Sequence, residues 1–269
     1  MNEDERPDVI RMLRKAVADA ERDGNIAFAW RFVRSGPEGG TPPLAHMLRG
    51  GRGGEVRLRI YLTITMMATS PPYDVRRNRR PAGWARLLGL EEPDTLGARR
   101  VNAAMEWLRD EDLIRLQPRK GSAPRILLRD PLVRGRRYTR PSTKARYVGI
   151  PSGLWSNGWI VDLTATGLAL LLVLKERLGG TDGPQYITSE RRAQYGLSHG
   201  TWTRATKELQ TYGLITVERV LQGDPDYDSP RLRNQFELNL ERLESESTRD
   251  ERERAAAVLS RQRSARTPA

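Results

Sequence analysis

The chain contains no cysteine among its 269 residues, which excludes disulfide bonds and thiolate metal sites. It has only two histidines, His46 and His199, and they lie far apart in the sequence. A zinc site or another transition-metal site would therefore lack its usual ligands, so we expect no metal and no cofactor. No segment reaches about 18 consecutive apolar residues, and no signal peptide opens the chain. These absences predict a cytoplasmic protein that does not bind a membrane.

Lysine is scarce as well. Only five of the 46 basic residues are Lys, so 41 are Arg, and the formal net charge is +12. Codon bias in a GC-rich genome explains most of the preference for Arg, but the preference has a chemical consequence. Arg pairs through two parallel hydrogen bonds with phosphates and with guanine edges. A positive balance of this size favours a polyanionic partner without specifying which sequence it binds.

Sequence signatures of catalysis are also missing. No G-x-x-x-x-G-K-[ST] motif is present, and the GGRGG run at 50–54 lacks the strand and helix that frame a dinucleotide-binding turn. The His-x-His cluster of a metal-dependent, tyrosine-type strand-nicking enzyme is absent. The acidic run 110–112 ends a predicted helix and is expected to face solvent. We therefore predict that the protein is not an enzyme.

The sequence instead contains one pattern twice, 101 residues apart. Residues 95–116 (TLGARRVNAAMEWLRDEDLIRL) and 198–217 (SHGTWTRATKELQTYGLITV) each show an apolar i, i+3, i+7 stripe followed by a strand. The matched positions are Val101 and Trp202, Ala104 and Ala205, Leu108 and Leu209, Leu113 and Leu214, and Ile114 and Ile215. A short helix ending in Gly-Leu precedes each copy, and a hairpin follows it. The repeat predicts two similar units.

The order helix, turn, helix, hairpin resembles the winged helix-turn-helix superfamily, whose second helix enters the DNA major groove. The second half is similar to a winged-helix module of DNA-binding proteins from GC-rich bacteria, and two such units in one chain resemble plasmid replication initiators. The resemblance implies an α+β, mainly α fold with two winged helix-turn-helix domains in tandem and an N-terminal helical extension. The predicted parts are an N-terminal helix with a mobile Gly/Pro-rich loop (1–54), the first winged helix domain (55–133), a basic linker and entry segment (134–163), the second winged helix domain (164–243) and a charged, disordered tail (244–269).

Local patterns place the elements of both units. Residues 56–69 permit a strand, but their position before the helix-turn-helix favours a helix. Residues 114–130 alternate apolar and polar side chains around a turn, as a hairpin does. Residues 6–23 form an amphipathic stripe that either packs on its own chain or forms a homodimer with a second copy. Residues 26–33 either form a short strand or continue this helix.

Candidate DNA contacts in the first unit lie on three segments. The outward face of the recognition helix carries Arg and Asn, which can read guanine and adenine; the alternative is an ordinary solvated helix face. A basic loop and the hairpin offer phosphate contacts. The predicted residues are Arg76, Arg77, Arg79, Arg80, Thr95 (also the expected N-cap), Arg99, Arg100, Asn102, Arg119, Lys120 and Arg125.

Candidate contacts in the second unit lie on its recognition helix and hairpin. They are His199, Thr201, Thr203, Arg204, Lys207, Arg231 and Arg233, whereas Trp202 takes the core position of Val101. Three aspartates between 224 and 228 would repel phosphate at the tip of this hairpin. Either this tip points away from DNA or the second unit contacts a protein.

The sequence therefore predicts a sequence-specific, nucleoid-associated protein that binds double-stranded DNA, first of all a transcriptional regulator. The alternatives are a plasmid or mobile-element replication initiator that binds origin repeats, and a structural adaptor that uses one winged helix for protein contacts.

Overall fold

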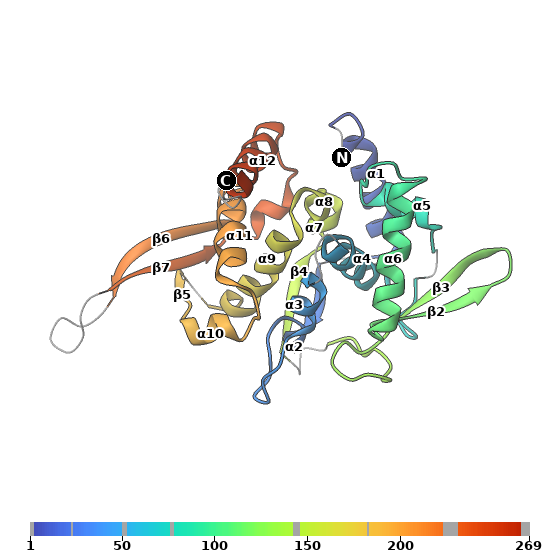
Figure 1. Cartoon of the computed structure of the whole chain (residues 1–269), viewed down its shortest axis with the longest axis horizontal. Coiled ribbons are helices and arrows are strands. Elements are labelled where there is room, and N and C mark those ends of the chain that lie inside the picture. Colours follow the sequence, from blue (N-terminus) through green and yellow to red (C-terminus); the bar gives the residue numbers. More distant parts are fainter. Residues whose placement is uncertain are drawn as a thin grey trace.

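The computed structural model describes residues 3–22, 24–49, 53–75, 78–141, 146–181, 183–222 and 231–264. Helices dominate it, and its small sheets are antiparallel. The predicted α+β, mainly α class is therefore confirmed. Figure 1 shows two long hairpins that project from opposite ends of the molecule, with the helices between them.

The first repeat spans residues 54–128. Its elements are α4 (Gly54–Met67), α5 (Pro81–Leu87), α6 (Leu96–Asp110), β2 (Ile114–Arg119) and β3 (Ser122–Leu128). Between α4 and α5, a single bridge pairs Asp74 with Leu127 of β3. The segment 56–69 thus lies in a helix, as its position in the repeat predicts, and its many β-branched residues do not override the helix because they pack inside the core.

The second repeat spans residues 165–238 and follows the same order. Its elements are α9 (Ala165–Leu178), β5 (Gln185–Tyr186), α10 (Ser189–Ala193), α11 (His199–Thr211), β6 (Ile215–Gln222) and β7 (Arg231–Leu238). β5 pairs with β7, just as Asp74 pairs with β3. All five pairs of positions that match at an offset of 101 are buried in both repeats, so the apolar register predicted from the sequence is that of the core.

The two repeats pack on each other through two helices of each. The helices lie in the order α6, α4, α9, α11, and each contacts the next (Figure 1). An Arg on α4 contributes to this contact: the Arg59 guanidinium donates to the carbonyl oxygens of Val161 and Leu163, both at 3.0 Å, just before α9. The buried apolar side chains of both repeats form one continuous core. The repeats are therefore held together by packing and not only by the linker.

The segments outside the repeats form the rest of the fold. They are α1 (Arg6–Asp19), β1 (Asn25–Ala29), α2 (Trp30–Val33), α3 (Pro43–Leu48), β4 (Tyr147–Pro151), α7 (Gly153–Ser156), α8 (Trp159–Asp162), η2 (Glu241–Glu244) and α12 (Arg249–Ser264). β1 pairs antiparallel with β4, from Asn25 opposite Pro151 to Ala29 opposite Tyr147. At 26–33 the structure has a strand over residues 26–29, and residues 30–33 form a separate helical turn that does not continue α1.

Two segments differ from the prediction. The stretch 43–48 was expected in a mobile loop but forms α3, because Pro43 begins the helix and Leu44 and Met47 are fully buried. The tail was expected to form at most a frayed helix before disorder, whereas residues 249–264 form one helix, α12, which packs on α11 and buries Ala255. Residues 265–269 lie outside the described part.

The amphipathic helix α1 packs within its own chain. Val9, Ile10 and Leu13 are buried, and α1 contacts α4, α5 and α7. Its apolar stripe is therefore already covered, and the predicted homodimer through this helix would have to use its polar face.

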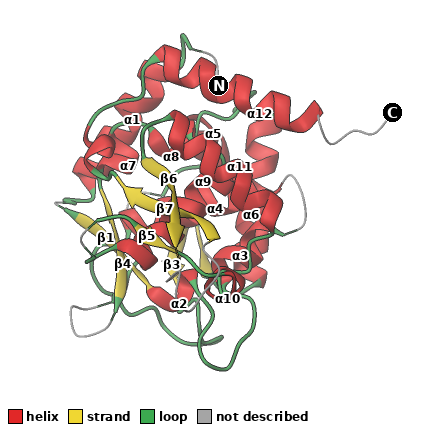
Figure 2. Ribbon diagram, turned by 90° about the vertical axis from the view of Figure 1, so that its left-hand side faces the viewer, coloured by secondary structure: helices red, strands yellow, loops and turns green. Residues whose placement is uncertain are grey.

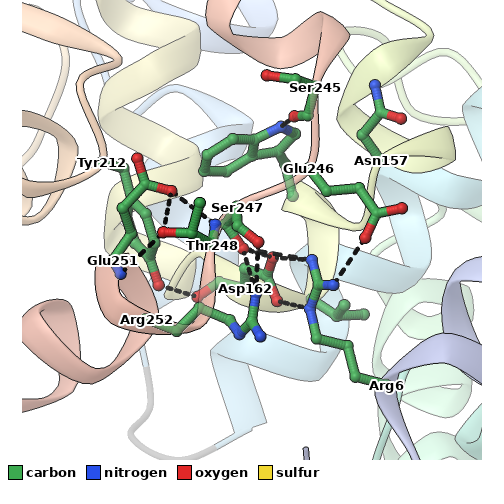
Figure 3. Close-up of polar contacts among 12 residues, drawn as sticks. Arg6, Asn157, Asp162, Tyr212, Ser245, Glu246, Ser247, Thr248, Glu251 and Arg252 are labelled. Atoms are coloured by element: carbon green, nitrogen blue, oxygen red, sulfur yellow. Dashed lines mark hydrogen bonds and ion pairs between the residues drawn. The ribbon is translucent and has the colours of Figure 1, made fainter.

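A buried polar cluster joins α1 to the C-terminal segment (Figure 3). The Arg6 guanidinium donates to both carboxylate oxygens of Asp162, at 3.2 and 2.8 Å, and to Glu246 at 2.9 Å. The Ser247 hydroxyl donates to Asp162 at 2.6 Å. Figure 2 shows the result, with α12 and α1 on the same side of the molecule.

Candidate nucleic-acid interface

The exposed face of α6 carries the predicted base-reading residues. Burial of Val101, Ala104 and Leu108 fixes the helix orientation, and it leaves Arg99 and Asn102 exposed. Within the described part of the chain, neither side chain has a hydrogen-bond or ion-pair partner. Arg100 is half-buried, and its charge acts on Arg59 of the core. The structure thus leaves Arg99 and Asn102 free for a ligand and turns Arg100 partly inward.

Thr95 takes the N-cap position of α6 but does not cap it. Its hydroxyl donates to the Glu92 carboxylate at 2.8 Å and accepts no backbone N–H. The predicted N-cap is therefore right in position and wrong in its hydrogen bond. Glu92 has a positive φ of 45° and provides the competing acceptor one turn earlier.

The first hairpin presents cations at its tip. Arg119 and Lys120 are exposed, and Gly121 makes the turn with a φ of +71°. Arg125 differs, because its Nε donates to the Asp74 carboxylate at 2.6 Å, and this hydrogen bond raises its pKa. On the described part of this hairpin, the exposed cations without a partner are therefore Arg115, Arg119 and Lys120, and Arg125 instead joins β3 to the segment before α5.

The basic loop before α5 is only partly available. Arg80 is exposed, whereas Arg79 is half-buried in a hollow beside the end of α1, where burial lowers its pKa and Asp19 raises it. Its buried Nε has no hydrogen-bond partner. Arg76 and Arg77 lie outside the described residues.

The second repeat presents a different set of side chains. His199, Thr203 and Lys207 are exposed on α11, whereas Thr201 and Arg204 are half-buried. The Thr201 hydroxyl lies 2.9 Å from that of Ser198 at the start of the helix. Trp202 is only 4% exposed, which confirms that it takes the core position.

The described part of the second hairpin carries two exposed arginines, Arg219 and Arg231, and one engaged arginine. Arg231 is exposed, but the Arg233 guanidinium lies 4.5 Å from the Tyr186 ring and hydrogen-bonds its hydroxyl. The three aspartates predicted at the hairpin tip lie outside the described residues. The predicted contacts therefore divide between exposed positions and positions that support the fold.

Sequence reasoning missed two features of these surfaces. Glu106 is exposed on α6, one turn after Asn102, and places a carboxylate on the face expected to be cationic. Arg192 of α10 lies against the α11 core, with its guanidinium 5.0 Å from the Trp202 ring. The exposure of Glu106 could have been predicted, because Glu106 follows Asn102 by four residues and so lies on the same face of the helix. The run Glu190-Arg191-Arg192 gave only a weak signal for the second feature, because nothing local distinguishes its two arginines.

Among the residues that the structure describes, no cluster of acidic and His side chains could hold a metal ion. Over the same residues, no helix is both long and apolar enough to cross a bilayer. No protein-family model matches the chain, and neither a curated protein nor a solved structure does.

Proposed function

We propose that the chain is a sequence-specific double-stranded DNA-binding protein built from two winged helix-turn-helix units. The observation that carries this proposal is the repetition of one arrangement: an exposed face on the second helix of each repeat, followed by a projecting hairpin (Figure 1). On a chain with a net charge of +12, each such helix has the dimensions that fit a major groove.

The exposed side chains support a division of roles. Arg99 and Asn102 have the donor geometry that discriminates guanine and adenine, and both lie free on α6. Arg119 and Lys120 at the hairpin tip suit phosphate, which positions a protein without reading sequence. On α11, His199, Thr203 and Lys207 form a second, less charged surface. Transcriptional regulation is the simplest role for such a protein.

Selection from a random double-stranded DNA library tests the proposal, with fluorescence anisotropy on the enriched site. Asn102→Ala should cost about 1–3 kcal/mol on that site and relax preference at one base pair. Lys120→Ala should weaken specific and random DNA alike, and it should reduce the salt slope by about one. The matched control is Arg11→Ala, because Arg11 is 77% exposed on α1, outside both repeats.

Failure to enrich any motif would refute sequence-specific binding. Equal losses on specific and random DNA for both Arg99→Ala and Asn102→Ala would show that α6 does not read sequence. The location of enriched sites would then separate two roles: sites that overlap promoters support a regulator, and direct repeats within an origin support a replication initiator.

A further inference from the structure

A groove on the second repeat lies between β7, α10 and α11. Its wall includes Tyr186, Arg192, His199, Trp202, Leu232 and Arg233. It is open to solvent, and the buried Trp202 side chain is part of its lining. Of these residues, the DNA-binding proposal uses only the exposed His199, so the rest of the groove needs its own explanation.

Two residues that line the groove each carry a buried hydrogen-bond donor without an acceptor. The Trp202 side chain is 4% exposed, and its indole Nε1–H has no partner. The Nε of Arg192 is also buried without a partner. Buried N–H groups in native proteins are almost always paired, so two unpaired donors beside one opening indicate a missing acceptor.

The charge in the groove is positive and incompletely balanced. The Arg192 guanidinium lies 5.0 Å from the Trp202 ring and 5.8 Å from the Phe236 ring, and in the described part of the chain no carboxylate pairs with it. Arg233 stacks on Tyr186 and lies near enough to Glu190 to lower the pKa of that carboxyl. One guanidinium therefore remains to pair with an anion, held flat by aromatic rings.

The rim of the groove is apolar. Leu232 is 66% exposed, unusually high for leucine in a strand, and Ile187 and Leu197 also line the groove. The groove thus has a cationic part and an apolar rim. A ligand that contacts both would carry an anionic head for Arg192 and Trp202 and an apolar body for Leu232. Inorganic phosphate would leave the apolar half uncovered.

The first repeat lacks this chemistry. At an offset of 101 residues, Trp202 corresponds to Val101 and His199 to Ala98, and alignment of the Gly-Leu ends of the two short helices places Ala85 opposite Arg192. The unpaired donors and the cation are therefore a property of the second repeat and not of the shared fold. We propose that this groove binds a small organic anion, a carboxylate on an aromatic or short apolar body.

The test is an ¹⁵N–¹H spectrum of the full-length protein, in which each of the six Trp residues gives an indole N–H peak. Trp202→Phe identifies the Trp202 peak. Titration with naphthalene-2-carboxylate should shift this peak to saturation. The neutral naphthalene-2-carboxamide at the same concentration should not shift it, because it lacks the charge that pairs with Arg192.

Variants complete the test. Arg192→Gln should weaken binding of the carboxylate by about tenfold or more. Arg231 lies exposed on β7 outside the groove wall, so Arg231→Gln should change the affinity for the carboxylate by less than about twofold. The other Trp peaks report whether each variant stays folded. An unshifted Trp202 peak at millimolar carboxylate, an equal shift with the carboxamide, or equal affinities of the two variants would each overturn the proposal.

Discussion

Several buried charged side chains in this protein join segments that are distant in the sequence. Arg6 and Asp162 form a two-hydrogen-bond pair whose side chains are 7% and 1% exposed. Glu176, buried on α9, accepts from the Tyr195 hydroxyl at 2.7 Å and pairs with Arg34 and Arg146. Such pairs specify which segments meet, and losing one partner leaves a buried charge alone.

Removal of the Arg6 side chain should therefore be costly. We expect Arg6→Ala to lower the free energy of unfolding by about 3–5 kcal/mol, because Asp162 would keep its buried charge without the guanidinium. Urea denaturation followed by circular dichroism measures the change. Arg11→Ala, on the exposed face of the same helix, should stay within about 0.5 kcal/mol of the parent. Equal effects of the two substitutions would contradict a stabilising role for the pair.

Glu208 predicts a pH dependence of stability. Its carboxylate accepts from the Thr164 backbone N–H at 2.7 Å and from the Thr164 hydroxyl at 2.5 Å, yet burial raises its pKa above the ordinary 4.5. The folded protein thus holds the proton of the Glu208 carboxyl group more tightly than the unfolded chain does. The resulting stability is full below the ordinary pKa and is lost as the pH rises through the raised one.

Glu208→Gln removes this titration. We expect the melting temperature of the variant, relative to the parent, to rise between about pH 5 and about pH 8, because only the parent then buries a charge. Differential scanning calorimetry across this range measures the difference. Glu106→Gln, exposed on α6, is the control and should show no such trend. A parent-to-variant difference that is constant with pH would refute the argument.

At the scale of single elements, the two recognition helices begin differently. Ser198 caps α11, because its hydroxyl accepts the Thr201 backbone N–H at 3.2 Å. Thr95 occupies the same position before α6 and makes no such bond. An N-cap hydroxyl satisfies one of the unpaired N–H groups at a helix start.

The two positions should therefore respond differently to alanine. Ser198→Ala should destabilise the protein by about 1 kcal/mol, and Thr95→Ala by only a few tenths. Chemical denaturation of the two variants in parallel provides the comparison. If Thr95→Ala proved the more damaging substitution, its hydroxyl would have a role in stability that the bond to Glu92 does not explain.

Elements with a strong local pattern could be predicted from the sequence, and elements held by distant contacts could not. The stripes of α6 and α11 were predicted because Val101, Leu108 and Leu209 recur at helical spacing. α3 was missed because its six residues are too few to show a helical period within a Gly/Pro-rich stretch, and the packing of α12 was missed because that helix buries few apolar residues. For α12 a local signal existed: Thr248 and Glu251 form a reciprocal capping box, with bonds of 3.2 and 2.7 Å.

The sequence predicted which candidate side chains point outward, but it predicted only in part which of them are free of partners in the fold. Helical periodicity placed Arg99 and Asn102 outward, since that depends on spacing alone. It could not show that Arg125 pairs with Asp74 or that Arg79 lies beside Asp19, because these partners come from other segments. The same limit applies to Arg192, whose role depends on the fold of three elements.

At the scale of the whole molecule, the packing of α6, α4, α9 and α11 holds the two repeats at a fixed separation. If both repeats contact one DNA site, the spacing of its two halves is set by this packing and not by a flexible linker. The Arg59 bonds to the segment before α9 contribute to that rigidity.

Changes in half-site spacing test this rigidity. Insertion of about five base pairs between the halves turns one of them to the opposite side of the duplex, and insertion of about ten restores the side but lengthens the site by about 34 Å. We expect both insertions to reduce affinity to that of one half-site in an anisotropy assay. Full affinity after the ten-base-pair insertion would show that the repeats move independently.

The contacts of α1 also determine when folding can finish during synthesis. Arg6 is made early, but its partners Asp162 and Glu246 are 156 and 240 residues later in the chain. β1 likewise waits for β4 before it can pair. Folding from the N-terminus as the chain emerges therefore cannot complete this molecule. The apolar stripe of α1 lacks part of its contacts until α7 has been made, so a nascent or truncated chain that ends before α7 exposes a surface that the finished protein covers.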